Sequence, residues 1–266
     1  MTSPVVARFA GFIGIALIYA FLLVPIVLVV ASSFSAGDLI TFPPQGLSLR
    51  WYREFAGSDS FVDAFVFSLW LAAISAVGAT TIGFLAAYAI ARLLRGRREL
   101  GQALMLLPVM IPHILIGMSL LLMLTVVPVP EAVALVAGHI VIALPFAIAA
   151  ILASLEGVDA ALEQAAMTLG ASRWRAMVEI VVPLASPGLL SAVLFSFIVS
   201  FGDVYIALFL SAPGMTTLPI EIFTYMQWES TPVVAAITTV QVLMIVALGL
   251  VIERLVGLKR VLRISG

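Results

Sequence analysis

Long runs of apolar, uncharged residues alternate with short charged segments along most of the chain. A helix needs about 20 residues to cross a hydrocarbon core of about 30 Å, and inside lipid the backbone must satisfy its own hydrogen bonds, which favours helices. Six runs are long enough: about residues 9–33, 64–91, 100–127, 132–155, 187–210 and 232–252, the fifth of which contains Asp203. The pattern therefore predicts an all-α integral membrane protein, with six transmembrane helices in one domain that covers residues 1–266.

The basic residues are distributed unevenly between the two sides of these spans. Arg and Lys are enriched in cytoplasmic loops. Eleven of the 13 fall on one side: Arg8, Arg92, Arg95, Arg97, Arg98, Arg173, Arg175, Arg254, Lys259, Arg260 and Arg263. Only Arg50 and Arg53 fall on the other. We therefore expect both termini and the segment 156–186 to be cytoplasmic.

The composition agrees with a membrane protein and excludes several kinds of chemistry. The chain is 63% hydrophobic and 10% charged, whereas soluble domains carry roughly 25% charged residues. It has no cysteine, which excludes disulfides, thiol catalysis and cysteine-ligated metals. Its single lysine, Lys259, does not stand in a phosphate-binding glycine loop. No constellation of nucleophile and base occurs, so we do not expect an enzyme. No nucleic-acid partner is expected either.

Two local patterns predict how particular spans are shaped and packed. Ala79, Gly83 and Ala87 recur every four residues in the second span, which lets another helix approach closely. Pro108 and Pro112 in the third span each remove a backbone donor, so this helix is expected to bend.

The long outer loop, residues 34–60, contains a short aromatic segment. Trp51, Tyr52 and Phe55 suit a helix that lies at the lipid headgroups. Contact of Trp51 or Arg53 with a ligand is the alternative.

Three ionisable residues lie within the spans. At about 1.5 Å per residue, His113 would lie roughly 20 Å below the outer end of the third span. His139 on the fourth span and Asp203 on the fifth would each lie roughly 10 Å below the outer surface. The histidines are interpreted as neutral side chains packed between helices. A carboxylate inside a membrane is costly, and two interpretations of Asp203 stay open. It either lines the translocation path with Tyr205 and His139, or makes a structural hydrogen bond to His139.

The segment 156–186 is the longest polar stretch, and its pattern predicts two short helices. Asp159–Leu169 forms the first, and Gly170 then takes a left-handed conformation. Ser172 caps a second helix, Arg173–Val182, which Pro183 closes. The arrangement predicts a compact cytoplasmic knob that fits into a partner.

The residues of this knob resemble the EAA loop of the inner-membrane permease subunits of bacterial ABC importers. The matching positions are Gln164, Ala165, Ala166, Gly170, Ile180 and Pro183. Gln164 occupies the family's glutamate position, with Glu163 one residue earlier, and Val182 replaces a leucine. The resemblance implies that Glu163 and the matching residues couple the chain to an ATPase.

Two further segments, 139–156 and 200–223, resemble the second permease subunit of spermidine/putrescine-type importers. The resemblance implies the type I importer permease (MetI-like) fold in the bacterial inner membrane, in contact with lipid. It also implies a second permease subunit, a dimer of ATP-binding subunits that holds ATP and Mg, and a periplasmic solute-binding protein. No cofactor is expected on this chain, and the implied solute is a polyamine.

An ion-coupled secondary transporter is the alternative function, with Asp203 and His139 as a proton or ion relay. Inverted repeats with broken helices would support it, but the two halves of the sequence show no such match.

Overall fold

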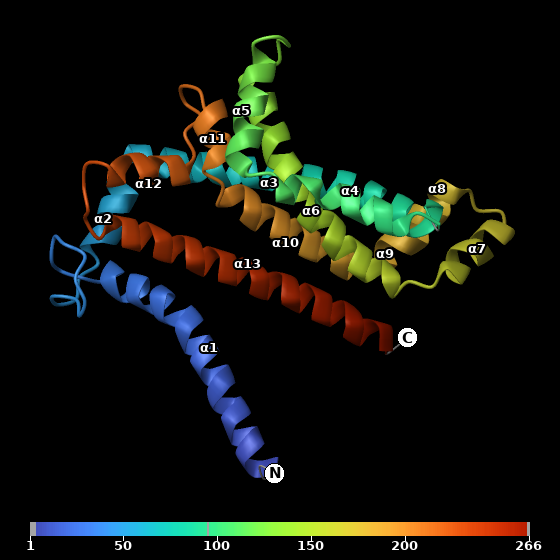
Figure 1. Cartoon of the computed structure of the whole chain (residues 1–266), viewed down its shortest axis with the longest axis horizontal. Helices are drawn as coiled ribbons and strands as arrows, with labels where there is room; N and C mark the ends of the chain where they lie inside the picture. The colour runs from blue at the N-terminus through green and yellow to red at the C-terminus, as the bar shows by residue number, and fades with distance from the viewer. Residues whose placement is uncertain (1–3, 95, 265–266) are drawn as a thin grey trace. The chain divides into compact units, whose positions relative to one another are not determined.

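The computed structural model describes residues 4–94 and 96–264, which form helices joined by loops (Figure 1). The helices are α1 (Pro4–Ser33), α2 (Arg50–Gly57), α3 (Asp59–Tyr88), α4 (Arg98–Met110), α5 (His113–Leu124), α6 (Glu131–Glu156), α7 (Ala160–Thr168), α8 (Arg173–Ala176), α9 (Val182–Leu184), α10 (Ser186–Phe201), α11 (Tyr205–Leu210), α12 (Leu218–Met226) and α13 (Val233–Ile264). Two π-helical segments, Ala89–Leu93 and Met177–Val181, continue α3 and α8. Arg95 lies outside the described residues, as do the side chains of Arg8, Lys259, Arg260 and Arg263.

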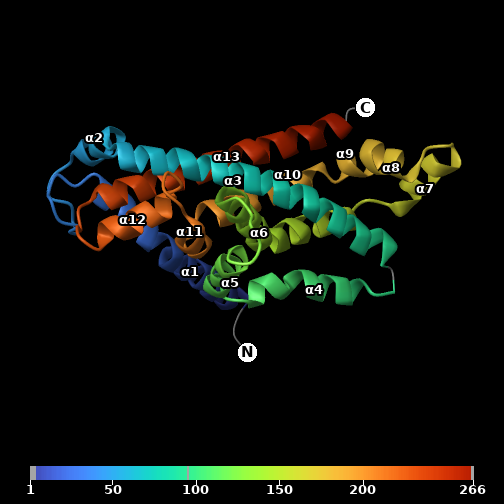
Figure 2. The same cartoon turned by 90° about the horizontal axis from the view of Figure 1, so that it is seen from above.

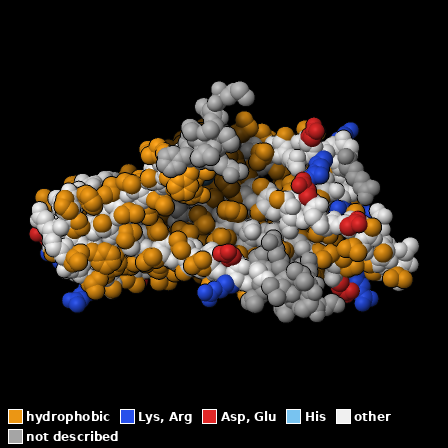
Figure 3. Space-filling model, turned by 90° about the horizontal axis from the view of Figure 1, so that it is seen from below, with side chains coloured by type: hydrophobic (Ala, Val, Ile, Leu, Met, Phe, Trp, Pro, Cys, Tyr) orange, Lys and Arg blue, Asp and Glu red, His pale blue; other side chains and the backbone are white. Residues whose placement is uncertain are grey.

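Four helices in the described residues are long and apolar enough to cross a membrane: Phe12–Ser33, Asp59–Leu93, Glu131–Glu156 and Val233–Leu255. They correspond to the predicted first, second, fourth and sixth spans. Two bent helix pairs raise the number to six if each pair is one span. Hydrophobic side chains cover most of the face shown in Figure 3. The helices and their apolar surface agree with an all-α membrane protein.

The predicted third span is broken rather than simply bent. Helices α4 and α5 meet at an angle of 86°, and α5 turns away from the line of α4 in Figure 1. Ile111 is extended, with ψ of 126°, because a residue before proline is disfavoured in the helical region. Pro112 therefore ends one helix and begins the next, which confirms the bend expected from the prolines and makes it sharper.

The predicted fifth span is also interrupted. Helix α10 ends at Phe201, and α11 begins at Tyr205 after the loop 202–204 that contains Asp203. At its other end, α10 meets the helical segment Arg173–Leu184 at an angle of 74°. A continuous helix over 187–210 is therefore wrong.

The chain forms two units, residues 1–62 with 222–244, and residues 63–221 with 245–266. In the second unit, α3, α6 and α10 run alongside one another (Figure 2). An added Cβ on Gly188 of α10 would lie 2.3 Å from Cβ of Ser154 on α6, so only glycine permits this approach. Gly83 of α3 also lies close to α6, with 3.0 Å between its added Cβ and Cβ of Ala147. The small residues of the second span therefore pack as predicted.

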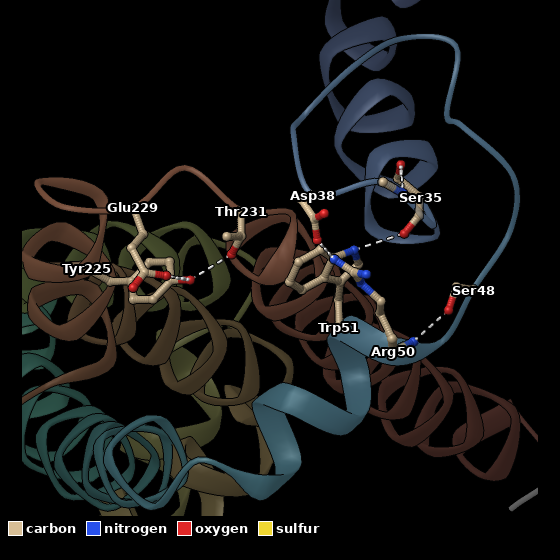
Figure 4. Close-up of polar contacts among 9 residues, drawn as sticks. Ser35, Asp38, Ser48, Arg50, Trp51, Tyr225, Glu229 and Thr231 are labelled. Atoms are coloured by element: carbon tan, nitrogen blue, oxygen red, sulfur yellow. Dashed lines mark hydrogen bonds and ion pairs between the residues drawn. The ribbon is translucent and has the colours of Figure 1, made fainter.

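In the first unit, the loop between α1 and α2 is held to α2 by polar contacts (Figure 4). Trp51 is only 3% exposed, and its Nε1 donates to the carbonyl oxygen of Ser35 at 2.9 Å. The guanidinium of Arg50 lies 4.0 Å from the Trp51 ring centroid and pairs with Asp38. The interpretation of Trp51 as a headgroup anchor is therefore wrong, because its indole is buried within the protein.

A second polar contact in this unit links the end of α12 to the loop after it (Figure 4). Burial raises the pKa of the Tyr225 hydroxyl, so this group stays protonated at neutral pH. It donates to Glu229 Oε2 at 2.7 Å and lies 2.7 Å from Thr231 Oγ1. These contacts hold the turn that leads into α13.

Candidate functional site

The segment 156–186 forms the predicted pair of short helices. Asp159 caps α7, its carboxylate accepting from the Ala161 amide at 2.9 Å. Gly170 adopts a φ of +95°, the left-handed conformation expected of it. Ser172 caps the second helix, its hydroxyl accepting from the Arg175 amide at 3.2 Å. Residues Asp159–Leu184 together form the knob.

The second helix of the knob extends further than predicted. Pro183 does not close it, because the helical segment continues to Leu184. The residues before Pro183 form a π-helical turn, in which the amide of Val182 bonds to the carbonyl of Met177. Pro183 stands in the first turn of α9, where a missing amide is tolerated. Met177 and Val181 are buried in the core of the second unit, so this helix is anchored to the bundle.

The predicted coupling residues fall into different environments. Gln164 and Ala165 are exposed and Ala166 is half-buried, so this part of α7 faces outward. Ile180 is half-buried and Pro183 is exposed on the second helix. Glu163 differs from them, because it is only 6% exposed.

Glu163 is buried against the end of the second span. The hydroxyl of Tyr88 donates to Glu163 Oε1, and Nε of Arg92 lies 3.5 Å from Glu163 Oε2. A terminal nitrogen of Arg92 also donates to the carbonyl oxygen of Val158 at 2.7 Å. These contacts were not predicted from the sequence, in which Arg92 indicated only the orientation of the spans. The four-residue spacing of Tyr88 and Arg92 was the available indication that they share a helix face.

Large apolar side chains on the knob are exposed. Leu162, Leu169 and Trp174 are 49%, 90% and 66% exposed. Exposed apolar residues that cluster on a surface mark sites of protein–protein contact. The knob is therefore fixed on one side through Glu163, and it carries exposed apolar side chains that a partner could cover.

A second candidate site lies at the break of the predicted fifth span. A pocket of about 320 Å³ is lined by His113, Phe146, Ile198, Val199, Gly202, Asp203, Val204 and Tyr205. It brings together Asp203 and Tyr205, two of the three residues predicted for the translocation path. His139 is absent from this lining.

Asp203 is bonded through both carboxylate oxygens. Its Oδ1 lies 3.2 Å from Nδ1 of His113, and its Oδ2 accepts from the Ile206 amide at 2.7 Å. The predicted depths separated His113 from Asp203, and this separation is wrong. The estimate treated the third span as straight, whereas the break at Pro112 places His113 at the start of α5, and α5 packs against α11.

His139 lies apart from that pocket. It is fully buried, and its Nδ1 lies 2.9 Å from the hydroxyl of Ser200 on α10. The hydrogen bond from Asp203 to His139 that the sequence suggested is replaced by two separate pairs. One joins His113 to Asp203, and the other joins His139 to Ser200.

Comparisons with known proteins identify relatives of the chain. Residues 79–258 match the family model described as the binding-protein-dependent transport system inner membrane component. The spermidine/putrescine transport system permease protein PotC of Haemophilus influenzae is 31% identical over 232 residues, which are 87% of this chain and 90% of that protein. The putrescine transport system permease protein PotI of Escherichia coli K12 is 32% identical over 241 residues, with 88% and 84% covered.

Solved structures support the same fold. A chain of a bacterial ABC transporter involved in the import of the acidic polysaccharide alginate superposes with a TM-score of 0.68 at 17% identity. The match covers 96% of this chain and 98% of that one. A second structure of such a transporter, in complex with a pentasaccharide-bound periplasmic protein, matches with a TM-score of 0.69 at 16% identity and covers 93% of each chain.

Proposed function

Because the chain belongs to the family of inner-membrane components of binding-protein-dependent transport systems, we propose that it is one of two membrane-spanning subunits of an ATP-driven polyamine importer. It is a multi-pass protein of the cytoplasmic membrane and a permease component of an ABC importer. The polyamine assignment is supported by two relatives whose names specify spermidine and putrescine.

The knob is the observation that carries the proposal. It presents exposed Leu169 and Trp174 beyond a buried anchor, in a chain that has no phosphate-binding loop of its own. An ATPase subunit that docks on these exposed side chains would supply the hydrolysis that this chain lacks. ATP and Mg would be bound by a dimer of such subunits. The knob would then transmit closure of the dimer to the helices, which rock between inward-facing and outward-facing states.

The proposal requires a particular topology in the membrane. Both termini and the knob are on the cytoplasmic side, as the eleven basic residues on that side indicate. Six spans result if each bent helix pair crosses once. A second permease completes the path, and a periplasmic solute-binding protein delivers the solute from outside. The complex of the alginate transporter with a periplasmic protein supports this arrangement by analogy.

The pocket beside Asp203 is proposed as part of the path. Polyamines are cationic at neutral pH, and an acidic side chain with a neighbouring phenol suits a cation that also donates hydrogen bonds. Asp203, Tyr205 and His113 line this pocket of about 320 Å³. His139 would support the path indirectly, by holding α6 to α10 through Ser200.

The family assignment favours an ATP-driven importer over the ion-coupled alternative. A direct relay between Asp203 and His139 would require a hydrogen bond between them. In the structure, Asp203 is instead paired with His113, and His139 with Ser200.

Affinity purification of the tagged chain from membranes in mild detergent tests the proposed assembly. We expect a P-loop ATPase and a second multi-span permease to co-purify with it. Leu169→Glu combined with Trp174→Glu should reduce retention of the ATPase about ten-fold or more, since interface anchors of this kind carry most of the binding energy. Leu39→Glu, at an exposed apolar residue of the outer loop, is the control. An ATPase that is retained equally by both variants would contradict the assignment of the knob.

A further inference from the structure

Glu163 stands one position before the residue at which the loop motif has its glutamate, and its environment differs from that of its neighbours. Gln164, at the motif position itself, is exposed. The side chain of Glu163 is only 7% exposed and faces the end of the second span. A carboxylate buried in this way is not available to a docked ATPase.

The contacts of Glu163 connect two segments of the chain that are far apart in sequence. Tyr88 precedes Glu163 by 75 residues and donates to its Oε1. Arg92 lies beside Oε2 at 3.5 Å and also holds the carbonyl oxygen of Val158, at the entry to α7. Tyr88 and Arg92, near the end of the second span, therefore hold both the entry to α7 and its first turn.

The helix that provides these contacts changes its winding at the same place. Beyond Tyr88, α3 continues as the π-helical segment Ala89–Leu93, which includes Arg92. Such segments are rare and occur frequently at functional sites. Ile90 of this segment is 2% exposed and belongs to the core between α3 and α6. A displacement of α7 that acts on Tyr88 and Arg92 would therefore act on the core of the second unit.

We propose that Glu163 is a positioning residue that anchors the first knob helix to the second span, through Tyr88 and Arg92, and does not contact the ATPase. Its role in transport rests on the proposed function. The exposed face of the knob receives the ATPase, and the Glu163 anchor passes the resulting movement to α3. Loss of the anchor would leave the ATPase bound but uncouple ATP hydrolysis from transport.

The anchor is tested first on the full chain alone, by hydrogen exchange of backbone amides in detergent. Glu163→Gln removes the charge that faces Arg92, and Tyr88→Phe removes the hydroxyl that donates to Glu163. Each should raise exchange in residues 158–168 about ten-fold, since a charge-assisted contact of a buried group is lost. Glu156→Gln is the matched control, because Glu156 forms an ion pair with Arg98 in which the Glu156 side chain is 60% exposed. Unchanged exchange in both test variants would refute the anchor, whatever the chain transports.

The second test measures polyamine uptake and ATP hydrolysis by the complete transporter in liposomes. Glu163→Gln and Tyr88→Phe should each reduce uptake per ATP hydrolysed about ten-fold, with the ATPase retained at the wild-type amount. Loss of ATPase retention in Glu163→Gln but not in Tyr88→Phe would show that Glu163 faces the ATPase, and would overturn the inference. Wild-type uptake per ATP in both variants would also overturn it.

A covalent rescue distinguishes positioning from a general structural effect. Because the chain has no cysteine, Tyr88→Cys with Glu163→Cys introduces a unique pair. A short bifunctional thiol reagent should restore coupled uptake in this variant, and the wild-type complex with the same reagent is the control. A linked pair that stays uncoupled would overturn the positioning role. If exchange supports the anchor but the wild-type complex shows no ATP-driven uptake, the proposed function fails and the anchor stands.

Discussion

Nδ1 of His113 lies 3.2 Å from Oδ1 of Asp203, although the two residues are 90 positions apart in the chain. The pair forms because the break in the predicted third span lies next to the break in the predicted fifth span. Pro112 ends α4 and lets α5 begin at His113, and the loop after α10 carries Asp203. Breaks of this kind inside a membrane are tolerated where the backbone is buried in protein or lines a water-filled cavity. The pocket at this site is the part of the chain that we propose as a path for the solute.

Substitution of Asp203 should separate its charge from its structural contact. Asp203→Asn keeps an oxygen that can accept from the Ile206 amide, so the protein should fold and reach normal levels in the membrane. Polyamine uptake should nevertheless fall about ten-fold, because the substitution removes the carboxylate that is proposed to face the cationic solute. Asp203→Ala should also lower stability by about 1 kcal/mol through the lost bond to the first turn of α11. Normal uptake by Asp203→Asn would remove Asp203 from the path.

The pairing of His113 with Asp203 predicts energetic coupling between them. A double-mutant cycle of His113→Ala with Asp203→Asn, measured by thermal unfolding in detergent, should give an interaction energy of about 1 kcal/mol. The cycle of His139→Ala with Asp203→Asn should give a smaller value, since His139 bonds to Ser200 instead. Equal interaction energies in the two cycles would contradict the observed pairing.

The left-handed conformation of Gly170 predicts a penalty for any side chain there. No atom lies within 4 Å of an added Cβ, so the cost of Gly170→Ala comes from the backbone alone. We expect a loss of about 1–2 kcal/mol in the stability of the knob. Gly157→Ala is the control, because Gly157 has a φ of −81° and ordinary contacts. Thermal unfolding that shifts equally for both variants would contradict the conformational argument.

The approach of α10 to α6 at Gly188 predicts steric destabilisation. An added Cβ would lie 2.3 Å from Cβ of Ser154 and 2.9 Å from the carbonyl oxygen of Ala150. Gly188→Ala should therefore destabilise the protein by about 1–3 kcal/mol, as overpacking does. Gly249→Ala should be neutral or stabilising, since its nearest neighbour is at 4.0 Å. The comparison requires only thermal unfolding of the two variants, and equal melting temperatures would contradict the close packing.

Hydropathy predicted which parts of the chain form long helices. A helix that crosses a membrane must be apolar over its whole length, whichever helices it packs against. Four predicted spans lie within a few residues of the observed helices. The local chemistry of the knob was also predictable. Asp159, Gly170 and Ser172 act on neighbouring backbone groups, so the sequence nearby contains all the information needed.

The contacts that were not predicted all join segments that are far apart in the sequence. Depth counted along a straight helix separated His113 from Asp203, and only the break at Pro112 brings them together. Trp51 was assigned to the headgroups by its residue type, but its partner Ser35 lies 16 positions earlier. The contact of Tyr88 with Glu163 spans 75 positions. Such pairings depend on how helices turn and pack, which hydropathy does not encode.

The most direct test of the central claim is uptake of labelled putrescine by liposomes that contain the chain with its co-purified partners. The account predicts uptake only when ATP is present on the knob side and the binding protein on the other. Gly170→Trp should abolish ATP-driven uptake without preventing membrane insertion. Uptake that proceeds without ATP under a proton gradient, or ATP-driven uptake that survives Gly170→Trp, would contradict it.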